Sequence, residues 1–225
     1  MGAESLGVHC EGPFISSGKK GAHPAPLLQT PDDGIKTIED FYGLDNLTEL
    51  RDGEGECQNP RPAIIKKITV APELPGMYNT IRDLAQRYGI ICSLGHSSAT
   101  YEQGLEGVRA GATMLTHLYN AMEPFLHRNP GLVGLIGAPE SDLPTTRGKT
   151  SRPFFGIITD DIHVHPSCVR AAWATHEDGC IITTDGTSAT GMSLPDGVYE
   201  SKPGRRVVKS GRKLFLEGTD TIAGG

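Results

Sequence analysis

The chain has 225 residues, a formal net charge of −6 and 37% hydrophobic residues, so it is long enough to bury a core of its own. The acidic balance excludes the basic surface that nucleic-acid partners require, and no apolar run reaches the ~20 residues of a membrane span. The five cysteines are scattered and never spaced as Cys-x-x-Cys, which indicates free thiols filling the core in a reducing compartment and predicts a cytoplasmic protein.

Short apolar segments recur along the chain and predict β-strands. They cover residues 6–10, 64–70, 90–94, 112–116, 155–159 and 180–184, and most of them end on a polar residue. Amphipathic segments predict helices between residues 76 and 89, 101 and 111, and 166 and 179, the last with Trp173 on its inner face. We expect polar, loop-like stretches over 43–62 and 137–153, and short antiparallel strands over 198–215 with a turn at Pro203-Gly204.

Two histidines stand at the ends of neighbouring predicted strands. His96 and His117 are 21 residues apart, which is about what one strand–helix–strand unit with short loops consumes. The spacing therefore places both imidazoles at the carboxyl ends of adjacent parallel strands, where α/β enzymes keep their chemistry. Two imidazoles presented side by side suggest a metal ion.

The alternation of strands and helices predicts an α/β fold with a parallel sheet. Polar residues at the end of strand after strand favour a closed (β/α)8 TIM barrel over an open doubly wound sheet, which gathers its ligands at one crevice. A complete barrel has eight strands and about 250 residues, so we expect residues 1–225 to form a single, incomplete barrel domain. Unpaired edges invite association or instability, and our hypothesis is that the isolated chain folds poorly.

Several motifs occur in a fixed order between residues 6 and 224: LGVHCEGPF with KKGAHP, SLGHSSAT, THLYNAM, HRNPGLVG, DDIHVHP and ITTDG. Together they resemble the N-acetylglucosamine-6-phosphate deacetylases of the amidohydrolase superfamily. The resemblance implies a metal-dependent hydrolase of amino-sugar catabolism, which removes acetate from N-acetyl-D-glucosamine 6-phosphate and leaves D-glucosamine 6-phosphate. It also implies a small β-sandwich domain that lies largely outside residues 1–225.

The resemblance places Glu11, His96 and His117 at the metal-ligand positions of the family. The residue chemistry agrees, because two imidazoles and one carboxylate suit a divalent ion, zinc first, and leave a position open for water. Such an ion lowers the pKa of bound water to about 7 and polarises an amide carbonyl. For any one of these histidines alone, the alternative is a hydrogen-bonded structural residue.

Asp185 in ITTDG matches the family's catalytic aspartate, which takes a proton from the attacking water and returns it to the departing amine. The alternative for this residue is a helix cap or a turn, where aspartate is also favoured. The residue after it, Gly186, stands where the family has alanine, and it adds local flexibility. His23 corresponds to a family histidine that helps to hold the carbonyl of the substrate.

The resemblance also implies a set of sugar-phosphate contacts. Among them Arg128 has a physical reason, because a guanidinium fork matches two phosphate oxygens, although surface arginines are common. In the family, Arg128 and His163 would reach the phosphate of a neighbouring subunit, which implies a homodimer. The expected substrate-binding residues are Ala22, His23, Asn120, Ala121, Arg128, Asp160, His163, Ile222, Ala223 and Gly224.

Two other functions stay open on the sequence. One is a different amidohydrolase, of the dihydroorotase or dipeptidase type, that acts on cyclic amides or dipeptides. The other is a non-catalytic fragment that binds a sugar phosphate and tolerates an empty metal site. Arg128 and its HRNPG context favour a phosphosugar over a cyclic amide.

Overall fold

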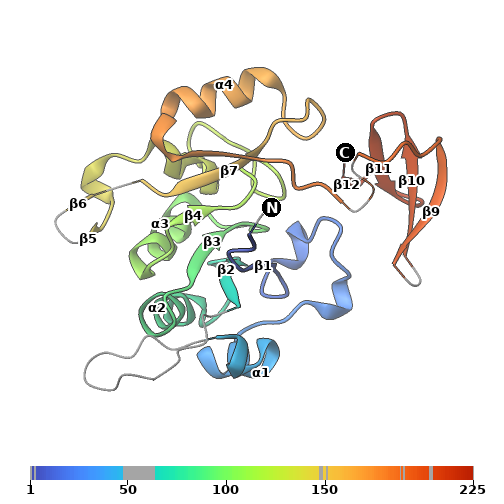
Figure 1. Cartoon of the computed structure of the whole chain (residues 1–225). Coiled ribbons are helices and arrows are strands. Elements are labelled where there is room, and N and C mark those ends of the chain that lie inside the picture. Colours follow the sequence, from blue (N-terminus) through green and yellow to red (C-terminus); the bar gives the residue numbers. More distant parts are fainter. Residues whose placement is uncertain are drawn as a thin grey trace.

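A parallel sheet forms the centre of the molecule in the computed structural model, with helices around it and a smaller antiparallel sheet to one side (Figure 1). The structure describes residues 2, 4–47, 64–146, 149–150, 152–187, 189, 191–202 and 205–224. The strands of the parallel sheet are β1 (Val8–Glu11), β2 (Ile65–Val70), β3 (Ile91–Leu94), β4 (Met114–Leu115), β7 (Phe154–Ile158) and β8 (Cys180–Thr183). All six were predicted from the sequence, within two residues at each end.

The strands lie in the sheet in the order in which they occur along the chain, β1-β2-β3-β4-β7-β8, and every neighbouring pair is parallel. Sequential winding in one direction is the topology of a (β/α) barrel, whereas a doubly wound sheet reverses its strand order at a switch point. The predicted parallel α/β sheet is confirmed, and its winding is consistent with an incomplete barrel. Within the described residues, β1 and β8 are the two edges.

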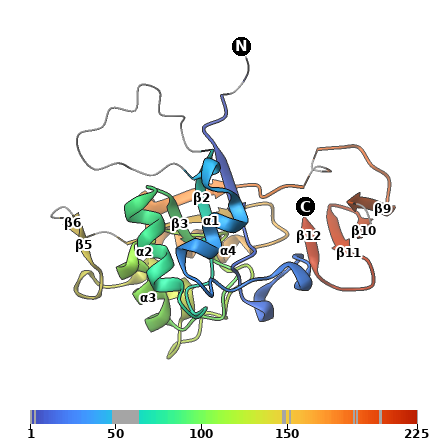
Figure 2. The same cartoon turned by 90° about the horizontal axis from the view of Figure 1, so that it is seen from below.

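The two faces of the parallel sheet carry different side chains. On the outer face, Cys92 lies against the backbone of α2 (Met77–Arg87), and Leu94 lies against Gly107 of α3 (Tyr101–Ala110). Because strand residues alternate between faces, Thr69 and Ser93 point to the opposite, inner face. α2 and α3 contact each other and lie side by side in both views (Figures 1 and 2).

Local sequence explains where the helices begin and end. α3 starts with a capping box, in which the side chains of Thr100 and Gln103 each bond the other's backbone N–H. Gly111 ends it with φ 126°, a conformation that favours glycine. The remaining helices are α1 (Ile35–Tyr42) and α4 (Pro166–Thr175) and the 3-10 segments η1 (Ser17–Lys19), η2 (Ala25–Leu27), η3 (Leu44–Asn46), η4 (Gly131–Gly137), η5 (Glu140–Asp142) and η6 (Glu177–Gly179).

Three expectations from the sequence differ from the structure. α1 was not predicted, because its eight residues follow a Pro- and Gly-containing stretch and show only two turns of apolar periodicity. The stretch 137–153 is more than a loop, since it contains η5 and the short strands β5 (Thr145–Thr146) and β6 (Lys149–Thr150). Trp173 is 49% exposed, because Ala172 faces the core and the next residue of a helix is turned about 100° away.

The C-terminal sheet has the antiparallel order β12-β11-β10-β9, which confirms the short strands predicted there. Its strands are β9 (Gly197–Lys202), β10 (Arg205–Ser210), β11 (Lys213–Leu216) and β12 (Ile222–Gly224). One link to the main body is a hydrogen bond of 2.9 Å that Arg212 Nη2 donates to the carbonyl oxygen of Asp160. The expected turn at Pro203-Gly204 and residues 48–62 of the expected polar stretch lie outside the described residues.

The described cysteines are Cys10, Cys92, Cys168 and Cys180, and all four are free thiols. Three of them belong to the core or pack against it, as predicted, whereas Cys168 is exposed. Cys57 lies outside the described residues. Among the helices of the described residues, none is both long enough and apolar enough to cross a membrane.

Candidate metal centre

Four side chains converge at the carboxyl end of the parallel sheet, and we call them the His/Glu cluster: Glu11, His23, His96 and His117. Glu11 is the last residue of β1, and the latter two histidines each lie two residues beyond a strand, β3 and β4. Glu11 Oε1 lies 3.0 Å from His96 Nε2 and 3.2 Å from His23 Nε2, and Glu11 Oε2 lies 3.6 Å from His117 Nε2. The Nε2 atoms of His96 and His117 are 3.0 Å apart.

These separations suit a small divalent ion. Bonds of about 2.0–2.1 Å from a zinc-sized ion to nitrogen or oxygen imply about 3.3 Å between two ligands of a tetrahedron. The two imidazole Nε2 atoms are 3.0 Å apart, Glu11 Oε1 lies 3.0 Å from that of His96 and Glu11 Oε2 lies 3.6 Å from that of His117, so the separations lie on both sides of this value. A second triple, with His23 in place of His117, also offers ligand atoms that lie within 4.8 Å of one another. The cluster therefore has one more donor than the three expected.

The backbone fixes the ring nitrogen that His96 offers to the cluster. Its Nδ1 lies 2.7 Å from the carbonyl oxygen of Lys19, and a carbonyl can only accept, so Nδ1 carries the proton. Nε2 is therefore the ring nitrogen that faces Glu11 and the cluster, and an outer hydrogen bond of this kind orients a metal-binding imidazole. His117 also turns Nε2 into the cluster, while its buried Nδ1 has no hydrogen-bond partner among the described residues.

The electrostatics of the cluster favour positive charge at its centre. Burial by itself raises the pKa of Glu11, but hydrogen bonds from His117, His23 and His96 outweigh it and hold that pKa far below its ordinary value. Burial lowers the pKa of His117, yet the hydrogen bond and charge of Glu11, with a contribution from Asp185, leave it raised. A carboxylate that raises the pKa of His117 carries a negative charge that a divalent cation would also neutralise. The residues present fit such an ion.

Four of the predicted site residues have a strained backbone, and one of them is Ala121 with φ 51°. His96, His117 and Asp185 have φ values of 47°, 28° and 44°, and each lies two residues after the end of a strand. The left-handed region costs residues other than glycine roughly 1–3 kcal/mol, and such strain gathers at functional sites. The sharp turn after each strand carries the side chain to the carboxyl end of the sheet, so all three residues face the same end.

Asp185 follows β8, the edge strand farthest in the sheet order from β1. Its carboxylate is exposed, and its backbone N–H donates to Thr183 Oγ1 over 3.3 Å. It lies near enough to the cluster for its charge to raise the pKa of His117. The carboxylate is thus close to the cluster but outside its hydrogen-bonded centre.

The expected substrate-binding residues near the cluster come from two loops. Ala22 precedes His23, and Ala121 accepts a 3.0 Å hydrogen bond from the backbone N–H of Ser97, which joins the loops that follow β3 and β4. Asn120 donates from Nδ2 to the carbonyl oxygen of Leu118 over 3.4 Å. These residues border the cluster through the backbone of the loops that carry its histidines.

The other expected contacts lie farther along the chain. Asp160 Oδ2 bonds His163 Nδ1 at 2.6 Å, and Oδ1 accepts from the backbone N–H groups of Ile162 and His163, so this turn is preformed. Arg128 is exposed. Ile222, Ala223 and Gly224 form β12, and Gly224 packs so tightly that a Cβ there would lie 2.5 Å from Thr187 Cγ2. That contact places β12 beside the segment that follows Asp185.

Sequence reasoning missed two residues that hold the cluster in place. Glu73 accepts hydrogen bonds from Ser97 Oγ at 2.7 Å and from the backbone N–H of Ser98 at 2.6 Å, and so fixes the loop just after His96. Its signal was present, because it is a carboxylate shortly after a predicted strand. The carbonyl oxygen of Lys19 has no such signal, since every residue carries one.

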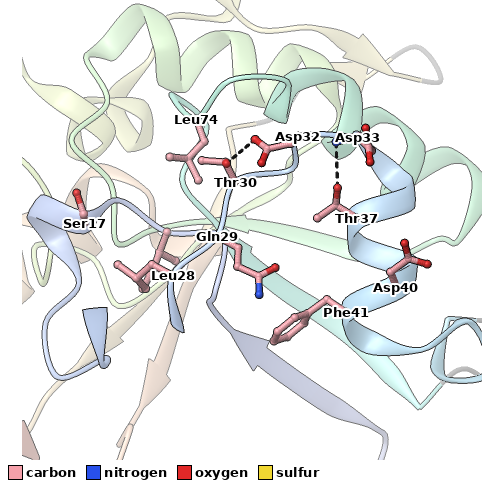
Figure 3. Close-up of a pocket in the computed structure, with 11 residues that line it drawn as sticks. Ser17, Leu28, Gln29, Thr30, Asp32, Asp33, Thr37, Asp40, Phe41 and Leu74 are labelled. Carbon is pink, nitrogen blue, oxygen red and sulfur yellow. Dashed lines mark hydrogen bonds between the residues drawn. The ribbon is translucent and has the colours of Figure 1, made fainter. Parts of the chain in front are cut away.

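A separate cavity is lined by none of the cluster residues. It has a volume of about 780 Å³ between residues 28–33 and α1, and three aspartates, Asp32, Asp33 and Asp40, line it (Figure 3). The dashed lines in Figure 3 are local bonds, from Thr30 Oγ1 to Asp32 and from the Asp33 N–H to Thr37 Oγ1. Since these contacts only shape a turn and a helix start, the His/Glu cluster remains the candidate site.

No protein-family model matches the chain. Curated relatives align with nearly all of it, and each is named N-acetylglucosamine-6-phosphate deacetylase. The relative from Danio rerio is 38% identical over 223 residues, which are 99% of this chain and 49% of the relative. The one from Homo sapiens is 37% identical over 224 residues, with 99% and 48% covered, and the one from Bacillus subtilis (strain 168) is 35% identical over 225 residues, with 100% and 48% covered.

Solved structures give the same result for the fold. A crystal structure of N-acetyl-D-glucosamine-6-phosphate deacetylase from Mycobacterium smegmatis matches with a TM-score of 0.75 and 33% identity, over 97% of this chain and 50% of that one. A mutant of that enzyme in complex with N-acetyl-D-glucosamine-6-phosphate matches with a TM-score of 0.76 and 33% identity, over 97% and 49%. The chain therefore spans about half the length of the relatives and structures that it matches.

Proposed function

We propose that the chain belongs to the N-acetylglucosamine-6-phosphate deacetylase family, as its similarity to these relatives suggests, and that it carries the reaction centre of that hydrolase. The reaction breaks the amide C–N bond of N-acetyl-D-glucosamine 6-phosphate, adds water across it, and gives D-glucosamine 6-phosphate and acetate. The observation that supports the proposal most is the convergence of Glu11, His96 and His117 at one end of a sequentially wound parallel sheet.

We propose that the parallel sheet is an arc of a (β/α)8 barrel of the amidohydrolase type, in a single partial domain. Besides the strand order, the inner face supports this interpretation. Ile91, Phe154 and Ile181 share that face through the strand registers, and all three are exposed large apolar residues. In a closed barrel, layers of side chains fill the interior, so these residues would be buried there.

Glu11, His96 and His117 would hold the ion, for which zinc is the preferred candidate because of the nitrogen and carboxylate donors. When bound, the ion polarises the amide carbonyl and lowers the pKa of water. His23 Nε2 lies 3.2 Å from Glu11 Oε1, so its ring is held at the edge of the cluster, where it would orient the carbonyl oxygen of the substrate. This role leaves the three predicted ligands as the ion's own set.

Asp185 would perform the proton transfers. Its carboxylate takes a proton from the attacking water and gives one to the nitrogen as the C–N bond breaks, so the amine leaves neutral. Its exposure and its position outside the hydrogen-bonded cluster leave it available for both steps. A carboxylate already bound within the cluster, such as Glu11, is less suited to this role.

The remaining proposals concern the sugar and its phosphate. Ala22, Asn120 and Ala121 would border the sugar, and Ile222, Ala223 and Gly224 would close the site from the side of β12. The preformed turn of Asp160 and His163, with the exposed Arg128, would bind phosphate, in part across a homodimer. A cytoplasmic location remains a prediction.

The test is a measurement of metal content paired with amine release from N-acetyl-D-glucosamine 6-phosphate on the same zinc-supplemented sample. We expect one ion per chain and turnover that a chelator abolishes, with no turnover of a dihydroorotate or a dipeptide. Equal or faster turnover of either control substrate would favour a different amidohydrolase. Metal binding without any turnover would favour a non-catalytic role.

A further inference from the structure

Four polar side chains, three from β1, β2 and β3 and one directly after β4, form an unbroken hydrogen-bonded chain next to the His/Glu cluster. His9 Nε2 lies 2.7 Å from Thr69 Oγ1, which lies 2.7 Å from Thr116 Oγ1. Thr116 Oγ1 in turn lies 2.6 Å from Ser93 Oγ. We call these four residues the hydroxyl layer; its two threonines and its serine are buried.

The layer adjoins every proposed ligand of the ion. His9 lies two residues before Glu11 on β1, Ser93 lies three residues before His96, and Thr116 directly precedes His117. Thr69 of β2 is the register partner of both Glu11 and Ser93, so the layer crosses the sheet in the row of the carboxylate ligand. A shift of any one of these strands would therefore disturb both the layer and the cluster.

Burial of hydroxyl groups here is not needed for stability alone. Replacing both partners of a buried hydrogen bond by apolar groups of the same shape is often nearly neutral, and the outer face of the same strands is apolar. What a fully bonded polar network adds is direction, because it specifies one arrangement of the elements that it joins. The layer thus indicates that the strands must be held in one fixed arrangement next to the cluster.

Thr116 connects the layer to both strained histidines. A Cβ on Gly95 would lie 2.7 Å from Thr116 Cβ, so the threonine side chain rests against the backbone just before His96. The backbone N–H of Thr116 donates to the carbonyl oxygen of Leu94 over 2.8 Å, and the next residue is His117. Both histidines have positive φ, a conformation that persists only where the surroundings hold it.

We propose that Thr116, anchored by Ser93 and Thr69, is a positioning residue that sets the separation of the two imidazole Nε2 atoms and so tunes the affinity for a divalent ion. The inference rests on the proposed metal site. The hydroxyl group of Thr116 performs this role, and the size of its side chain does not. Thr116→Val removes the hydroxyl and keeps the shape, whereas Thr116→Ser keeps the hydroxyl.

The test is the affinity of the full chain for Zn²⁺ and Co²⁺, measured by competition with a chelator. Loss of an outer-shell partner costs about 10–100-fold in metal affinity, so we expect at least tenfold weaker binding by Thr116→Val and near wild-type binding by Thr116→Ser. Thr80→Val is the matched control, because Thr80 is fully buried in α2 and its hydroxyl donates to the carbonyl oxygen of Gly76, which belongs neither to the layer nor to the cluster. It should lower the melting temperature and leave the affinity unchanged.

The Co²⁺ absorption spectrum gives a second readout that a loss of stability would not move, and we expect Thr116→Val to change its visible bands. Ser93→Ala, which leaves the Thr69–Thr116 bond in place, should weaken binding less and serves if Thr116→Val does not fold. Wild-type affinity and spectrum in Thr116→Val, or equal losses in Thr116→Val and Thr80→Val, would overturn the inference alone. Failure of the wild-type chain to bind either ion would overturn the metal site as well.

Discussion

The imidazoles and the carboxylates of the site rest on different parts of the parallel sheet. His96 and His117 follow β3 and β4, which are paired on both sides and whose flanking segments are buried. Glu11 ends β1 and Asp185 follows β8, and these are the edge strands, where Val8 is 45% and Ile182 is 72% exposed. The comparison teaches that the core fixes the histidine half of the site, while the carboxylate half depends on strands with one neighbour each in the described residues.

Removing a central ligand should have the largest effect. His117→Ala should abolish binding of the ion and all turnover. Only two of the three proposed ligand side chains would remain, and a catalytic tetrahedral site needs three. Metal analysis and the deacetylation assay on the same sample measure both. The control is His127→Ala, an exposed histidine outside the cluster. If His117→Ala kept a full complement of ion, the second triple with His23 would be the true site.

In the carboxylate half of the site, removal of the proposed acid–base group should reduce turnover but not metal binding. Asp185→Asn should keep the ion, since the residue lies outside the cluster, and should lose about 10²–10⁴-fold in turnover number. Steady-state kinetics with a metal assay separate the two properties. Asp178→Asn, a change at another exposed aspartate, should leave both unchanged. Wild-type turnover in Asp185→Asn would exclude it as the acid–base group.

The stability of the two regions can be compared with one substitution in each. Leu115 of β4 is fully buried, so Leu115→Ala should lower the free energy of unfolding by about 2–5 kcal/mol. Ile182→Ala, on the exposed edge strand β8, should change it by about 0.5 kcal/mol or less. Denaturant titrations give both values. Similar losses would contradict the comparison and indicate that a further segment covers β8.

A smaller loss of stability is expected where the loop that contains Gly21 contacts His96. Gly21 has φ 53°, and a Cβ there would lie 3.2 Å from His96 Cε1. Gly21→Ala should lower the free energy of unfolding by about 1–2 kcal/mol, because alanine is strained in the left-handed region. It should also weaken metal binding, because His96 must move. Gly211→Ala matches the strain, with φ 57° and no atom within 4 Å, and should leave metal binding unaltered.

The sequence predicted the central half of the molecule well for a physical reason. Each parallel strand is a short apolar run bounded by turn residues, and the spacing of His96 and His117 places them at one end of adjacent strands. The structure brings these two together with Glu11, as the motifs imply. A buried strand shows as a run of apolar residues next to one another in the chain, so one sequence is enough to predict it.

Other parts of the site depend on contacts that no local pattern records. The bond from His96 to the carbonyl oxygen of Lys19 joins residues 77 positions apart and involves a group that every residue has. The hydroxyl layer likewise depends on the pairing of β1 to β4, after which Thr116 follows directly, and not on the type of its residues alone. The eight residues of α1 form a segment too short for its apolar periodicity to distinguish it from the polar loop before it.

We infer above all that one ion binds Glu11, His96 and His117 together, and so links the histidine half of the site to its carboxylate half. X-ray absorption of the zinc-loaded chain tests it most directly, because imidazole rings give a distinct scattering pattern around the metal. We expect two imidazole nitrogens and oxygen ligands at about 2.0–2.2 Å, with one imidazole fewer in His117→Gln. A spectrum with no imidazole scattering, or one that His117→Gln leaves unchanged, would contradict it.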